Sequence, residues 1–108
     1  MTELDPAPDA ASRLDPLLIE PAQLLICAAL AVPVSHRVKT LAELTAIREE
    51  SLASSIEQLS AAGRVQTHQD AGGDAWVWMT EAGRADLIAH LRALRALLGK
   101  VDGLLTVH

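Results

Sequence analysis

Residues 49–79 read EESLASSIEQLSAAGRVQTHQDAGGDAWVWM, and this stretch decides the fold. Its first half has apolar residues at spacings of four and three, the period of a helix with one buried face: Leu52, Ile56 and Leu59. Gly63 follows, and glycine commonly ends a helix because it accepts the left-handed backbone conformation. We therefore predict a helix over residues 49–62.

The second half of this stretch changes period. Residues 64–69 and 75–79 have the alternation of strands, and the turn-forming sequence Asp70-Ala71-Gly72-Gly73-Asp74 lies between them. This pattern predicts a β-hairpin over residues 64–79.

Two further helices are predicted upstream. Asp15 before Pro16 signals a helix start, because the carboxylate can accept from free backbone N–H groups and proline has none to satisfy. Pro21 is expected to divide a first turn from the main helix, which Pro33 closes. After an extended stretch at residues 37–39, Thr40 is expected to cap a short helix with these inward-facing residues: Leu41, Leu44 and Ile47.

The last helix is predicted over about residues 80–105, beginning at Thr80. Its apolar residues alternate at spacings of four and three, which is the seam of a coiled coil. The stripe persists over about three heptads, more than one small domain can bury, and this predicts a homodimer. The expected interface residues are Leu87, Leu91, Leu94, Leu98, Val101 and Leu105.

The order of elements predicts a mainly α protein with a small β-hairpin (α+β). The 108 residues fit one domain, residues 14–108, after a tail rich in Ala, Pro and Asp, residues 1–13, which is expected to be disordered. No apolar run reaches the roughly 18 residues of a membrane span, and the first residues lack the order of a secretory signal. A cytoplasmic protein without membrane contact is the expectation.

Three segments, in order along the chain, carry a recognisable pattern: LDPLLIEPAQLLI (14–26), LASSIEQLSAAGRV (52–65) and WVWMTEAGR (76–84). They resemble the Leu-Leu-x-x-Pro-x-Arg-Leu-x-Ile opening, the Leu-x-x-x-Leu-x-x-Leu-x-x-x-Gly-x-Val ending of the recognition helix, and the Leu-Thr-x-x-Gly-Arg start of the final helix in small bacterial winged-helix regulators of the MarR and ArsR type. Gln23 stands where that family usually has arginine.

This resemblance implies a winged helix-turn-helix with a long C-terminal dimerisation helix, acting as a DNA-binding transcription regulator. The helix over 49–62 would enter the major groove, the hairpin over 64–79 would be the wing, and the last helix would form a two-fold dimer spanning two half-sites. Serine and glutamine can read base edges, while arginine and lysine can contact phosphates. The expected DNA contacts are Arg37, Lys39, Arg48, Ser51, Ser54, Ser55, Gln58 and Arg64.

The negative charge of the chain favours an alternative to DNA binding. The net charge is -5, no lysine or arginine lies between residues 49 and 62, and two carboxylates occupy the wing tip. Phosphate binding draws its affinity from basic residues, so a winged-helix module that has lost DNA and binds another protein is the second hypothesis. Trp76 and Trp78 alternate along their strand and share one face, which makes them candidate contacts for that partner or for a ligand.

Other chemistries lack the residues they need. The single cysteine, Cys27, lies among apolar neighbours and cannot form an internal disulfide or a cysteine-rich zinc site. The four histidines include no pair spaced by four, and no nucleophile motif, phosphate loop or paired carboxylates are present. We therefore expect no metal, no cofactor and no catalytic site. The operator, the effector and the partner's identity stay open.

Overall fold

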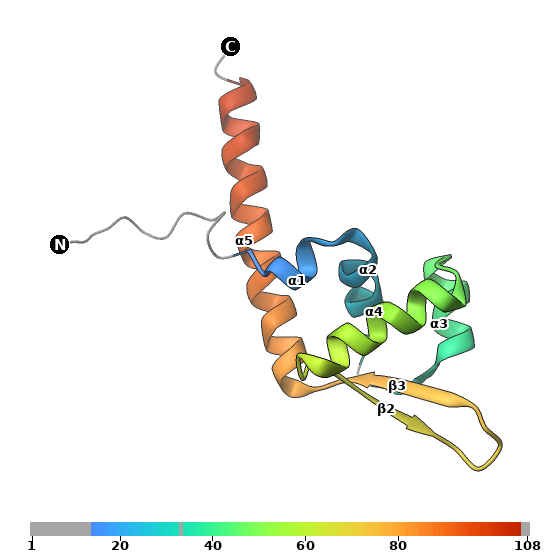
Figure 1. Cartoon of the computed structure of the whole chain (residues 1–108). Coiled ribbons are helices and arrows are strands. Elements are labelled where there is room, and N and C mark those ends of the chain that lie inside the picture. Colours follow the sequence, from blue (N-terminus) through green and yellow to red (C-terminus); the bar gives the residue numbers. More distant parts are fainter. Residues whose placement is uncertain (1–13, 33, 107–108) are drawn as a thin grey trace.

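The computed structural model describes residues 14–32 and 34–106. The predicted tail and the predicted helix end at Pro33 lie outside the described residues. The elements in chain order are α1 (Pro16–Ile19), α2 (Pro21–Ala29), β1 (His36–Arg37), α3 (Val38–Thr45), α4 (Glu49–Ala61), β2 (Val65–Gln69), β3 (Ala75–Met79) and α5 (Glu81–Thr106). The predicted class, mainly helical with a small sheet, is confirmed (Figure 1).

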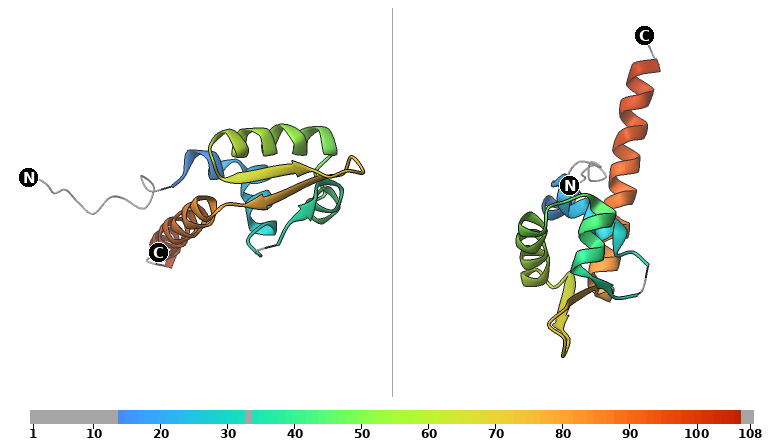
Figure 2. Two further views of the ribbon diagram at one scale, coloured as in Figure 1. Left: turned by 90° about the horizontal axis from the view of Figure 1, so that it is seen from below. Right: turned by 90° about the vertical axis from the view of Figure 1, so that its right-hand side faces the viewer.

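The helices α1 to α4 and the sheet form one body, and the second half of α5 projects from it (Figure 1). The hairpin of β2 and β3 extends at the opposite end of the molecule, and α4 runs beside it (Figure 2). The final helix and the hairpin therefore leave the body in different directions, so each has a surface that the other described residues do not cover.

The sheet has three antiparallel strands in the order β1-β3-β2. The predicted hairpin pairs Val65 with Met79 at its base and Gln69 with Ala75 near its tip. The strand β1 was expected only as an extended stretch, because two residues are too few to show a strand period. It pairs Arg37 with Trp76, and this pairing ties the segment before α3 to the wing.

An aliphatic core joins the helices to the sheet. It contains no Phe or Tyr, since the sequence has neither, and the predicted buried face of α4 belongs to it. The buried members are Leu18, Ile26, Cys27, Leu30, Leu41, Leu52, Ile56, Leu59, Val65, Val77 and Leu87.

Two expectations for α3 were wrong. The helix begins at Val38, three residues before Leu41, and Thr40 caps nothing, because the chain turns into the helix directly where the β1 ladder ends at Arg37. Leu44 was expected to face inward, but it is 62% exposed. The buried face instead includes Leu41 and Thr45, four residues apart, and the Thr45 hydroxyl donates to the Leu41 carbonyl at 2.8 Å.

The helix starts at Pro16 and Pro21 are confirmed. The Asp15 carboxylate accepts from the backbone N–H of Leu17 at 3.0 Å, as predicted, and α2 starts at Pro21. The end of α4 is also confirmed, because Gly63 follows it with a φ of 75°. A left-handed residue that is not glycine, Ala46, makes the turn between α3 and α4.

A close contact joins the base of the wing to the start of α5. The backbone N–H of Thr80 donates to the Arg64 carbonyl at 3.0 Å, and the Thr80 hydroxyl donates to the Gly63 carbonyl at 2.7 Å. The same hydroxyl oxygen accepts from the N–H of Gly83 at 2.9 Å, which caps the helix. A Cβ at Gly83 would overlap the Arg64 carbonyl oxygen. Glycine is therefore required there by a backbone contact.

The substitution Gly83→Ala should lower the free energy of unfolding by about 3 kcal/mol, because the wing base and α5 must separate to admit a methyl group. Urea denaturation followed by circular dichroism would measure this loss. Gly99→Ala is the matched control, since a Cβ there meets nothing within 4 Å, and it should stabilise α5 by about 0.5–1 kcal/mol. Equal effects of the two substitutions would contradict the contact.

The buried thiol of Cys27 should react slowly in the native protein. Burial raises the pKa of the Cys27 thiol to about 11 from an ordinary 9.0, so at pH 8 about a hundredfold fewer molecules carry the reactive thiolate. Iodoacetamide at pH 8 should therefore label the native protein far more slowly than the urea-unfolded chain, with mass spectrometry as the readout. Labelling at similar rates would show that the thiol is accessible and ionised in the native state.

Candidate nucleic-acid interface

The helix α4 has one buried face and one polar face. Leu52, Ile56 and Leu59 are buried, whereas Ser51 and Ser54 are exposed on the other side. Ser55, predicted as a further DNA contact, is half-buried. Three exposed glutamates share this helix: Glu49, Glu50 and Glu57. The polar face thus presents hydroxyl groups and carboxylates, without a cation.

Gln58 is exposed on α4, but it also has a partner inside the chain. Its side-chain oxygen accepts a hydrogen bond from the side-chain N–H of Gln23, which is buried in α2. The side-chain oxygen of Gln23 is itself buried and has no hydrogen-bond partner among the described residues. This bond restrains the Gln58 side chain and leaves its side-chain NH2 group without a partner inside the described chain.

Three of the four predicted phosphate contacts are exposed around the start of two helices. Arg37 immediately precedes α3, Lys39 lies in its first turn, and Arg48 immediately precedes α4. Neither helix has a side-chain hydrogen bond at its N-terminus. A hollow lies between these helix starts and the wing tip, and its charged lining is Arg37, Lys39, Glu43, Glu49 and Asp74.

The structure gives Arg64, the fourth predicted phosphate contact, another role. Its guanidinium lies 2.6 Å from a carboxylate oxygen of Asp15 and 2.9 Å from one of Asp86, with only 17% of the side chain exposed. Its partners come from the start of α1 and from α5. These two ion pairs join the base of the wing to α1 and α5 within the protomer.

The carboxylate of Asp70 organises the wing tip. One of its oxygens accepts from the backbone N–H groups of Gly72 and Asp74, each at 2.9 Å, and the other accepts from the indole N–H of Trp76 at 2.9 Å. The bonds from Trp76 and from the backbone of Asp74 and Gly72 hold the pKa of Asp70 below its ordinary 3.8. A carboxylate expected to face phosphates is thus already bonded to three N–H groups.

Sequence reasoning missed this role of Asp70, although a signal was present. An aspartate two residues before a glycine commonly bonds its own backbone in this way.

The segment that contains α3, α4 and the wing has a negative net charge. Between His36 and Met79 the sequence has four basic and six acidic side chains.

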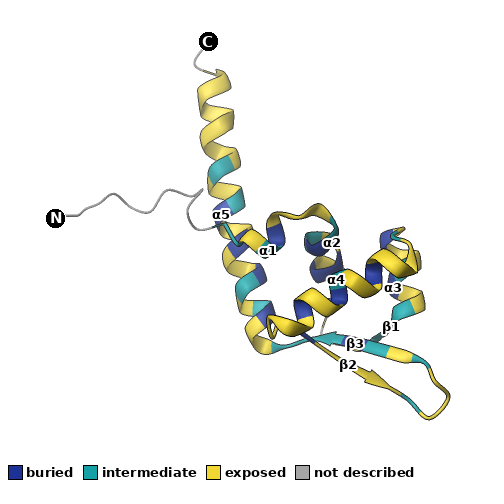
Figure 3. Ribbon diagram, viewed as in Figure 1, coloured by how far each residue is buried: buried dark blue, intermediate teal, exposed yellow. Residues whose placement is uncertain are grey.

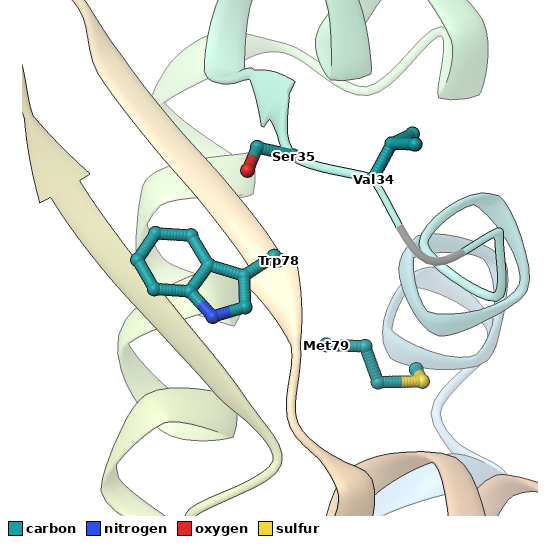
Figure 4. Close-up of a pocket in the computed structure, with 4 residues that line it drawn as sticks. All are labelled: Val34, Ser35, Trp78 and Met79. Carbon is teal, nitrogen blue, oxygen red and sulfur yellow. The ribbon is translucent and has the colours of Figure 1, made fainter.

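The two tryptophans of β3 lie in different surroundings. Both are half-buried, while Val77 between them is fully buried, which agrees with the predicted alternation. Trp78 lines a small open hollow together with Val34, Ser35 and Met79 (Figure 4). Trp76 instead lies near the wing tip, where the Arg37 guanidinium stands 5.2 Å from its ring centre.

The predicted leucine seam divides into two parts. Leu87 is buried in the core of the protomer, and Leu94 is half-buried. The exposed part of the seam follows the same helix outward: Leu91, Leu98, Val101 and Leu105. Leu104 joins it at 67% exposure. In Figure 3 the far end of α5 is exposed on every residue described.

The other titratable side chains of the described residues do not gather into a metal site. Within residues 14–32 and 34–106, no group of three His, Cys, Asp or Glu side chains is placed to hold a metal ion. His90 is buried, and its Nδ1 accepts from the backbone N–H of Asp15 at 2.9 Å, which is a structural bond between α5 and the start of α1. No helix of the described residues combines the length and hydropathy that a membrane crossing requires.

Neither a protein-family model nor a curated protein sequence matches the chain. Several solved structures, however, are similar to it. A transcriptional regulator homologue from Pyrococcus horikoshii OT3 has a TM-score of 0.76 and 22% identity, with 80% of this chain and 88% of that chain covered. BpsR from Bordetella bronchiseptica, whose DNA binding 6-hydroxynicotinic acid regulates, has a TM-score of 0.69 and 18% identity, with 85% and 74% covered.

A MarR-family transcriptional regulator from Silicibacter pomeroyi is also similar, with a TM-score of 0.64, 22% identity, and 90% and 77% of the two chains covered. Two of these three proteins are described as transcriptional regulators, and none is described as an enzyme. The order α3, α4, hairpin and long α5 is the one that the sequence resemblance predicted. The chain has the winged helix-turn-helix fold of MarR-type transcriptional regulators.

Proposed function

We propose that the chain is a cytoplasmic transcription regulator that binds DNA as a homodimer. The observation that carries this proposal is the exposed polar face of α4, which lies beside the wing on a helix-turn-helix scaffold. An α-helix fits the major groove of B-DNA, and Ser51, Ser54 and Gln58 can exchange hydrogen bonds with base edges there. The winged-helix structures that the chain resembles support the same placement.

Phosphate contacts would come from the helix starts. Arg37, Lys39 and Arg48 are exposed there, and helix N-termini favour anions because their backbone N–H groups are free. The hydrogen bonds to Asp70 remove part of the objection raised by the acidic wing tip, since that carboxylate is already occupied. Three contacts per protomer make about six in a dimer, and the affinity should therefore fall as the salt concentration rises.

The second half of α5 supports the dimer. Its exposed leucines and valine continue the apolar face that packs on the body lower down, and such a surface on a soluble protein commonly marks an interface. Pairing two copies through α5 would place two α4 helices about one DNA turn, roughly 34 Å, apart on a palindromic site. A small molecule that changed this spacing would regulate binding, as 6-hydroxynicotinic acid regulates DNA binding in BpsR.

The second candidate function, binding of another protein, rests on the groove between α4 and the wing. Glu50 and Glu57 line it together with apolar residues of both elements, among them Ala53, Ile56 and Ala75. A partner with a basic surface would be complementary to these carboxylates, whereas a phosphate would be repelled.

The first test measures fluorescence anisotropy with the DNA upstream of the protein's own gene and with a random duplex, over a series of salt concentrations. We expect submicromolar, sequence-selective binding with a slope of log K against log salt of about -5, from six phosphate contacts per dimer. Arg48→Gln should make the slope shallower by about 2 because each dimer loses two contacts. Absence of binding to both duplexes at low salt would contradict the proposal and favour a basic protein partner.

The second test concerns the dimer. Leu98→Glu places a charge on a side chain that is 59% exposed in the protomer, so the fold should survive while the dimer dissociation constant rises at least about tenfold. Sedimentation velocity would measure the change in mass. Leu44→Glu is the matched control, because Leu44 is 62% exposed on α3, away from α5. If both variants stayed dimeric, α5 would not be the interface.

A further inference from the structure

Four side chains at the wing tip form one connected arrangement, which we call the wing frame: Asp70, Trp76, Arg37 and Asp74. Asp70 bonds the indole N–H of Trp76 and the backbone of Gly72 and Asp74, which fixes the indole against the turn. Arg37 lies across from Trp76 in the β1–β3 ladder and stands 5.2 Å above its ring. The wing therefore presents the Arg37 guanidinium on the face of an indole ring that is hydrogen-bonded to Asp70.

The cation of the wing comes from a neighbouring strand. The tip itself, residues 70–74, contains no lysine or arginine. Arg37 belongs to β1, and with Lys39 it lines the hollow between the helix starts and the wing tip. Because an arginine over an aromatic face is attracted to it, Trp76 limits the positions that this otherwise flexible side chain can take.

The pairing of Arg37 with Asp74 is loose. Its Nε lies 3.8 Å from the Asp74 carboxylate, and the two side chains are 55% and 46% exposed. Exposed ion pairs at such a distance contribute little, so an incoming phosphate can replace Asp74 at small cost. Arg37 thus contacts two groups: the Trp76 ring, which is held by Asp70, and the Asp74 carboxylate, which a phosphate can replace.

We infer that Asp70 and Trp76 are positioning residues, which hold Arg37 where the wing meets a DNA phosphate, and that Asp74 occupies Arg37 until the phosphate replaces it. This inference rests on the proposed DNA binding. It assigns opposite roles to two aspartates of the same turn. Asp70 supports DNA binding although it is negative, while Asp74 opposes it.

The test compares Asp70→Asn and Asp74→Asn, which remove the same charge four residues apart. Long-range electrostatics alone predicts tighter DNA binding for both. The frame predicts that Asp70→Asn weakens binding about fivefold, because the amide that replaces one oxygen cannot accept the indole N–H of Trp76 when the other remains bonded to the backbone. Asp74→Asn should tighten binding about threefold, since it removes the competing anion.

Fluorescence anisotropy at two salt concentrations measures these changes, with Arg37→Gln as the reference for complete loss of the contact. If wild type binds and Asp70→Asn binds as tightly or more tightly, the positioning role is overturned while the proposed function stands. If wild type binds no duplex, the proposed function fails and the inference fails with it. Urea denaturation of each variant confirms that the fold is retained.

A readout in the free protein tests the frame without DNA. The two tryptophans give two indole N–H resonances, and that of Trp76 should report its bond to Asp70. Because the pKa of Asp70 is lowered in the folded protein, the bond is complete above the ordinary 3.8 and is lost as pH falls through the lowered value. The resonance should shift there in wild type and not in Asp70→Asn. The same shift in both would overturn the frame and assign it to Asp74.

Discussion

The arrangement of the molecule depends on Arg64, which joins three elements at one point. Its carbonyl oxygen accepts from Thr80 and lies where a side chain at Gly83 would have to be, so the wing base sits directly on the first turn of α5. Its guanidinium pairs with Asp15 before α1 and with Asp86 in α5. The direction in which the wing leaves the body relative to α5 is therefore set by contacts around this residue. In a dimer built on α5, the same contacts would set the distance between two wings.

This use of Arg64 has a cost for nucleic-acid binding, because an arginine at the base of the wing no longer faces outward. At the wing tip, Asp70 and Arg37 compensate for the lack of an outward-facing arginine. The acidic side chain is bonded to the turn and the indole, while the cation comes from β1. The acidic region keeps a small number of exposed basic groups, and all three lie around the starts of α3 and α4. Affinity from so few cations must be supplemented by pairing of two protomers and by contacts to base edges.

Local patterns predicted most of the fold. The spacing of Leu52, Ile56 and Leu59, the glycine after α4 and the hairpin turn all depend on neighbours in sequence, and each was confirmed. The features that the sequence did not show depend on distant residues. The start of α3 is set by pairing with β3, and the chain's own body buries Leu87. Arg64 looked like a surface cation because its partners Asp15 and Asp86 are 49 and 22 residues away. Charge patterns count such residues without showing where they point.

We propose that α4, the helix starts and the wing frame form one DNA-binding surface. A titration of the ¹⁵N-labelled protein with its upstream duplex, followed by two-dimensional nuclear magnetic resonance, tests this most directly. We expect shifts at Ser51, Ser54 and Lys39 and at the indole N–H of Trp76, with the Trp78 indole and the buried residues of α2 unchanged. Shifts confined to Trp78 and the second half of α5, or no shifts at a stoichiometric excess of duplex, would show that this surface does not bind DNA.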